Sequence, residues 1–162
     1  MNFFSVSNYE IKLENSKDAV LSELNKLTKS SEQYISNWNN QTFIGKVNDN
    51  GFEIVLSKKI LGQLCVFRGK FQNINGILEI KVNKVFRLIF LIFFIFPIAG
   101  FAMALVKNGI SKITELILPT ISTLFVLRFI FLEFGFRVFS KIGINKLLKI
   151  EGIGKIGIIK TR

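Results

Sequence analysis

A stretch of nineteen residues without a charged side chain, Leu88 to Val106, constrains this chain more than any other feature of its sequence. At the rise of an α-helix it forms roughly 28 Å of helix, close to the ~30 Å hydrocarbon core of a bilayer. A buried helix of a soluble protein is the alternative, but such helices are seldom apolar on every face for this length. The segment therefore predicts a membrane-spanning helix. Basic residues flank it: Lys81, Lys84, Arg87 and Lys107.

A second apolar segment runs from about Ile113 to Phe136, after a link with the turn signal Asn108-Gly109. Its inner part, residues 116–136, is 21 residues long and is enough to cross a bilayer. We expect residues 85–136 to form a transmembrane helical hairpin with both chain ends on one side. Seven basic residues lie near the span ends on that side and two in the connecting loop, which predicts cytoplasmic termini.

Residues 1–84 precede the hairpin and predict a cytoplasmic α+β domain. Alternating apolar and polar residues indicate a strand over 3–13, and a helix capped by Asn15 or Ser16 follows. Four short strands are expected at 42–47, 52–57, 64–71 and 77–82, paired as two hairpins around Asn-Gly turn signals. The predicted fold class is thus an α+β membrane protein: a β-α-β-β-β-β domain, then the hairpin, with only residues 83–85 between the last expected strand and the first membrane helix.

Residues 137–162 are predicted to be a basic tail that extends the second helix amphipathically along the membrane surface. For residues 151–162 the sequence leaves a strand and a frayed end both open. The chain carries a net charge of +11, of which residues 134–162 contribute +6 from seven basic residues and one acid. Attraction to anionic cytoplasmic lipid explains this excess, and a nucleic-acid-binding surface is the competing explanation.

Catalytic and metal-binding patterns are not found in the sequence. The chain has no histidine and one cysteine, Cys65, and it contains no HExxH, CxxC, GxSxG or Walker-type loop. We therefore predict a protein that is not an enzyme, with no metal site and no cofactor.

Four basic residues in the central strands form the first candidate site. Alternation places Arg68 and Lys70 on one face of a strand and Phe67 and Phe71 on the other. Such a face could bind the phosphates of a nucleotide or of a single-stranded nucleic acid, with aromatic rings nearby for stacking. The competing interpretation is a solvated sheet face beside anionic lipid. The predicted ligand-binding residues are Lys58, Lys59, Arg68 and Lys70.

The second candidate site is polar and lies within the second apolar segment. An arginine inside a membrane span costs about 2.5–3.5 kcal/mol unless it snorkels to the interface or faces water or a partner. Snorkelling of Arg128 and assembly of several copies around a polar stripe are both open. In a homo-oligomer the stripe would line a pore, with Arg128 as an anion-attracting or gating ring. The predicted pore or helix-interface residues are Thr120, Ser122, Thr123 and Arg128.

Short motifs in the chain resemble an uncharacterised family of small bacterial two-helix membrane proteins. The family's Phe-x-Gly, Gly-Phe and Gly-x-Phe motifs read here as Phe43-Ile44-Gly45, Gly51-Phe52 and Gly69-Lys70-Phe71, followed after the spans by Glu133 and Arg137. The order of domains also resembles the membrane effectors of anti-phage systems such as CBASS, Panoptes and Hailong. This resemblance implies that Lys58, Lys59, Arg68 and Lys70 contact a ligand, and that a partner enzyme produces the signal.

The leading expectation is a homo-oligomeric effector or ion channel of the bacterial inner membrane. A nucleotide or oligonucleotide on the cytoplasmic domain would gate it, in anti-phage defence, and membrane lipids would be further partners. The alternative is a non-conducting membrane anchor or adaptor whose cytoplasmic domain binds another protein.

Overall fold

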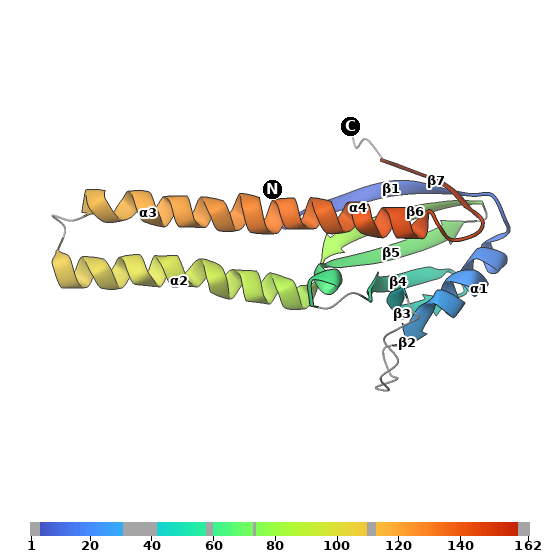
Figure 1. Cartoon of the computed structure of the whole chain (residues 1–162), viewed down its shortest axis with the longest axis horizontal. Helices are drawn as coiled ribbons and strands as arrows, with labels where there is room; N and C mark the ends of the chain where they lie inside the picture. Colours follow the sequence, from blue (N-terminus) through green and yellow to red (C-terminus); the bar gives the residue numbers. More distant parts are fainter. Residues whose placement is uncertain (1–3, 31–41, 58–59, 73, 110–112, 159–162) are drawn as a thin grey trace. The chain divides into compact units, whose positions relative to one another are not determined.

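The computed structural model describes residues 4–30, 42–57, 60–72, 74–109 and 113–158 (Figure 1). The chain is α+β, as predicted, and divides into two compact units. The first unit joins residues 1–83 to residues 138–162, and the second is residues 84–137. The predicted site residues Lys58 and Lys59 lie outside the described residues.

The first unit is built on a seven-stranded sheet in the order β2-β3-β4-β5-β6-β1-β7. Neighbouring strands are antiparallel, except that β2 runs parallel to β3. The five expected strands correspond to β1 and β3 to β6, and the structure adds β2 directly after the first helix and β7 near the end of the chain. The strands are β1 (Val6–Leu13), β2 (Thr28–Ser30), β3 (Phe43–Asn48), β4 (Gly51–Leu56), β5 (Cys65–Gln72), β6 (Asn75–Val82) and β7 (Ile153–Ile158).

Helix α1 (Lys17–Leu27) begins at one of the two predicted caps, Ser16, whose side chain accepts a hydrogen bond from the Ala19 amide at 3.4 Å. Its apolar stripe is buried, with Val20 and Leu24 fully inaccessible to solvent. A short 3-10 helix, η1 (Ile60–Leu64), connects β4 to β5. The buried apolar side chains of the strands and of α1 thus belong to the core of this unit.

The hairpin between β3 and β4 differs in detail from the expectation. Asn48 pairs with Gly51, so the loop is Asp49-Asn50 and the glycine is the first residue of β4. A Cβ on Gly51 would overlap the carbonyl oxygen of Gly69 on β5. The glycine therefore permits two strands to approach closely, and it does not supply the positive φ that an Asn-Gly turn would require.

Helix α4 (Gly135–Leu147) continues into the first unit and packs on the sheet. A Cβ on Gly143 would overlap the ring of Phe67, which is completely buried on β5. Ser140 Oγ lies 3.7 Å from Cys65 Sγ, also on β5. Leu147 on the same helix is fully buried. Residues 138–147, which the sequence assigns to a basic tail, thus belong to the same compact unit as the sheet.

The segment after α4 completes the sheet. Ile150 and Ile153 are buried, and β7 then pairs antiparallel with β1, with Ile156 opposite Ile11. Of the two alternatives left open for residues 151–162, the strand is therefore formed over Ile153–Ile158.

The second unit is a pair of helices. Helix α2 spans Lys84–Asn108, and the second helix is continuous over Ile113–Leu147 through α3 (Ile113–Phe125), the π-helix η3 (Val126–Phe134) and α4. Figure 1 shows α2 and α3 side by side. Both helices are long and apolar enough to cross a membrane, and none of the most apolar part of α2 is buried, against 6% for the second helix.

Replacement of Gly143 by alanine tests the packing of α4 on β5. In a solvated helix this change stabilises by about 0.5–1 kcal/mol, but here the methyl group would overlap the Phe67 ring. We expect Gly143→Ala to lower the free energy of unfolding by about 1–3 kcal/mol, measured by denaturant titration in detergent. Gly157→Ala is the matched control, because a Cβ there has open space around it. Equal stability of the two variants would contradict the proposed packing.

The buried thiol beneath α4 predicts a pH dependence. Burial raises the pKa of Cys65 from 9.0 to about 11, with a smaller opposing effect from the Ser140 hydrogen bond. The unfolded thiol ionises first, so this contribution to stability is complete below pH 9.0 and is lost as the pH rises to about 11. Across this pH range, the free energy of unfolding should therefore fall more steeply for the wild type than for Cys65→Ala, as measured by denaturant titration at each pH. Parallel curves would show that the thiol is not buried against α4.

Candidate functional site

A ladder of alternating charges crosses the face of the sheet opposite to α4. Lys46, Glu53, Arg68 and Glu79 are direct cross-strand neighbours on β3, β4, β5 and β6. Glu53 Oε2 accepts hydrogen bonds from Arg68 Nη2 at 2.7 Å and from Nε at 3.1 Å. Each such pair on an exposed sheet face contributes about 0.2–1 kcal/mol. The guanidinium of Arg68 is thus already held by a carboxylate.

A hollow of about 890 Å³ lies over β3, β4 and β5, and we call it the sheet hollow. Arg68 and Lys70, two of the four predicted ligand residues, both line it, and Lys46 adds a third cation. Glu53 is the carboxylate in the lining, so the charged side chains sum to +2. The remaining lining residues are Gly45, Asn48, Asn50, Gly51, Phe52, Gly69, Phe71 and Gln72.

The aromatic rings near the sheet hollow are core residues. Phe67 and Phe71 lie on the opposite face from Arg68 and Lys70, as the alternation predicts, and they are 0% and 5% exposed. Phe52 is 3% exposed and lies 5.7 Å from Phe71, centroid to centroid. These three rings are therefore buried in the core, and the stacking of bases on nearby aromatic rings stays a prediction. The charged and amide side chains are the polar part of the lining.

Sequence reasoning missed Lys46 and the amides of the hollow. The signal was present in the hairpin: once Asn48 pairs with Gly51, Lys46 must face Glu53 and hence Arg68. The prediction used alternation along a single strand, which does not show cross-strand neighbours.

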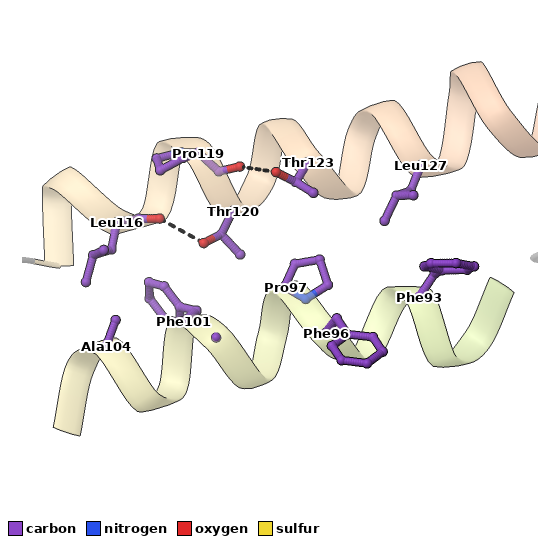
Figure 2. Close-up of a pocket in the computed structure, with 11 residues that line it drawn as sticks. Phe93, Phe96, Pro97, Phe101, Ala104, Leu116, Pro119, Thr120, Thr123 and Leu127 are labelled. Carbon is purple, nitrogen blue, oxygen red and sulfur yellow. Dashed lines mark hydrogen bonds between the residues drawn. The ribbon is translucent and has the colours of Figure 1, made fainter. Parts of the chain in front are cut away.

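The second candidate site is divided by the helix geometry. Thr120 and Thr123 line a hollow of about 550 Å³ between α2 and α3, which Figure 2 shows. Their hydroxyls donate to the carbonyl oxygens of Leu116 and Pro119, four residues earlier, each at 2.8 Å. Ser122 and Arg128 are not among the residues that line this hollow. The hollow therefore brings together two of the four predicted residues.

The π-helix η3 gives Arg128 a partner that sequence reasoning did not identify. Arg128 Nη1 lies 3.3 Å from Glu133 Oε2, and each side chain is about a quarter exposed, 24% and 25%. Residues five apart point about 140° away from each other in an α-helix. The i to i+5 periodicity of a π-helix brings them together, and such segments are frequent at functional sites.

Glu133 also contacts a second arginine. Its Oε1 accepts a hydrogen bond from Arg137 Nε at 3.2 Å, so one carboxylate holds two guanidiniums. Arg128 additionally lies 5.6 Å from the centroid of the Phe129 ring. We call Arg128, Glu133 and Arg137 the arginine triad; its net charge is +1. The i, i+4 spacing of Glu133 and Arg137 predicts contact on an α-helix, and this signal could have been found in the sequence. The five-residue spacing of Arg128 and Glu133 does not predict contact on an α-helix.

No known protein family, curated protein or solved structure matches this chain.

Removal of the Glu133 carboxylate tests the arginine triad. Glu133→Gln leaves the guanidinium of Arg128 without its carboxylate in the middle of an apolar helix. We expect a loss of about 1–3 kcal/mol in the free energy of unfolding, measured by denaturant titration in detergent. Glu115→Gln, in the first turn of the same helix, is the control and should change stability far less. Equal losses in the two variants would mean that the triad has no special role.

Proposed function

We propose that this protein is a membrane-anchored sensor of an anionic ligand of the nucleotide class. The observation that carries the proposal is the convergence of Arg68, Lys70 and Lys46 on the sheet hollow. Its volume of about 890 Å³ falls within the range of small-molecule sites, about 300–1,000 Å³. The net +2 charge of its lining favours a phosphate-bearing ligand.

The membrane anchor is the helix pair α2 and α3–η3. A core helix of a soluble protein is mostly buried, whereas these two have almost no buried surface over their most apolar parts. Exposure of so many large apolar side chains to water would be unfavourable, and a bilayer removes that cost. We propose insertion in the bacterial inner membrane with both termini cytoplasmic, because the basic residues concentrate near the chain ends.

Two short connections support transmission of a signal from the sheet to the helices. Only Asn83 separates β6 from α2, and its backbone amide donates to the Leu64 carbonyl at 2.9 Å. On β5, Phe67 contacts α4 at Gly143, while the next residue, Arg68, lines the sheet hollow. A ligand that moves β5 would therefore act on the helix that continues into the second span.

We propose that the response is the opening of an ion-conducting homo-oligomer, since two helices cannot enclose a water-filled path. A non-conducting anchor or adaptor is the second candidate. It is favoured by the ion pair between Arg128 and Glu133, which neutralises the guanidinium that a gating ring would require. Ion flux through liposomes separates the two: ligand-dependent flux that Arg128→Gln alters supports the channel, and no flux at any ligand concentration supports the anchor.

Ligand binding to the sheet hollow is testable with lysine variants. We expect Lys70→Ala to weaken binding of a fluorescent cyclic dinucleotide about tenfold, which corresponds to the loss of one charge-assisted contact. Lys155→Ala is the matched control, because Lys155 lies on β7, three strands away from β5. The measurement is a titration of the full chain in lipid nanodiscs, with inorganic pyrophosphate as competitor. Equal affinity of both variants, or no binding of either probe, would overturn the proposed ligand site.

A further inference from the structure

If the helix pair spans a bilayer as proposed above, Arg137 of the arginine triad lies at the depth of the lipid headgroups. Residues 116–136 form the apolar part of the second span, and at 1.5 Å per residue they cover about 30 Å. Arg137 is the next residue, so its side chain lies at the headgroup level. Glu133 lies about one turn, or 6 Å, deeper in the hydrocarbon region.

Arg137 is positioned to bind an anion. Its side chain is 75% exposed, and only its Nε is used in the contact with Glu133. A guanidinium has five N–H groups, and the four on its terminal nitrogens make no hydrogen bond or ion pair with another described residue. The carboxylate of Glu133 holds the guanidinium in a defined orientation, which lowers the entropy cost of binding.

Charge balance indicates what the anion is. The arginine triad carries +1, from two guanidiniums and one carboxylate, and a phosphodiester carries −1. A bound phosphodiester would therefore bring the cluster to neutrality at the edge of a low-dielectric region, where an uncompensated charge is costly. Lys84 and Arg87 at the start of α2 add positive charge at the same side of the membrane.

The apolar surface beside Arg137 fits a lipid better than a free phosphate. Phe134 lies one turn before Arg137 and is 64% exposed, and Phe131 is 60% exposed. An acyl chain can lie along these rings while its phosphate contacts the guanidinium. We propose that the arginine triad is a binding site for the phosphate group of an anionic phospholipid, with Arg137 as the contacting residue. This inference rests on the membrane insertion proposed above.

Native mass spectrometry of the full chain in detergent tests the proposal, with phosphatidylglycerol and phosphatidylcholine as probes. We expect Arg137→Gln to reduce the bound fraction of phosphatidylglycerol about fivefold and to leave phosphatidylcholine unchanged. Arg137→Lys retains the charge and should keep most of the binding. Lys107→Gln is the matched control, because it removes one cation at the other end of α2. An equal reduction in Arg137→Gln and Lys107→Gln, or none in either, would overturn the site.

Two further measurements separate the possible sources of failure. Millimolar inorganic phosphate should not displace the lipid; displacement would show that the site takes free phosphate and would overturn the lipid assignment. Extraction of proteoliposomes at alkaline pH tests insertion on its own. Wild-type protein released from the vesicles would overturn the membrane anchor, whereas retained protein with undiminished lipid binding in Arg137→Gln would overturn only the lipid site.

Discussion

The contact between α4 and β5 is the interaction on which the rest of the first unit depends. Gly143 allows the helix to lie directly on the Phe67 ring, and Ser140 and Leu147 of the same helix are also buried. This packing returns the chain to the sheet after the helix pair, so that β7 can pair with β1. Without it, the residues that follow the second apolar helix would lose their core partner. Residues 1–83 and 138–162, which the helix pair separates in the sequence, thereby form one folded unit.

Acidic side chains neutralise many of the cations that first suggest function in this chain. Glu53 holds Arg68, Glu79 holds Lys81 at 3.2 Å, and Glu133 holds both Arg128 and Arg137. An arginine that is already paired contributes less to a ligand than its formal charge indicates, because binding must compete with the carboxylate. In the described part of the chain, the positive charge most open to a ligand therefore lies at Lys70 in the sheet hollow and at the terminal nitrogens of Arg137.

The π-helix has a physical role in this balance. It occurs where the second apolar helix carries charge, and its periodicity places Glu133 beside Arg128, which an α-helix would not do. The ion pair compensates part of the cost of an arginine in an apolar segment. The same carboxylate then orients Arg137 at the end of the span, so one acid serves both a structural and a proposed binding function.

The local elements follow from the sequence because they depend on neighbours in the chain. Nineteen uncharged residues require a long apolar helix, and alternation over β1, β5 and β6 separates buried from exposed residues, as Phe67 and Arg68 show. Ser16 could be named as a cap for the same reason. Arg68 and Lys70 could be placed on one face by alternation alone, whereas the other two predicted residues, Lys58 and Lys59, lie outside the described residues.

Contacts between residues far apart in the sequence were decided by the tertiary structure. An amphipathic helix such as residues 138–147 can bury its apolar face on a membrane or on a sheet, and the pattern is the same in both cases; the glycine opposite Phe67 determines the outcome. Lys46 lies in one row with Arg68 only because β3, β4 and β5 pair in this register. Glu133 contacts Arg128 only because the segment between them is π-helical. Periodicity specifies which side chains share a face, but the partner of that face depends on packing between distant segments.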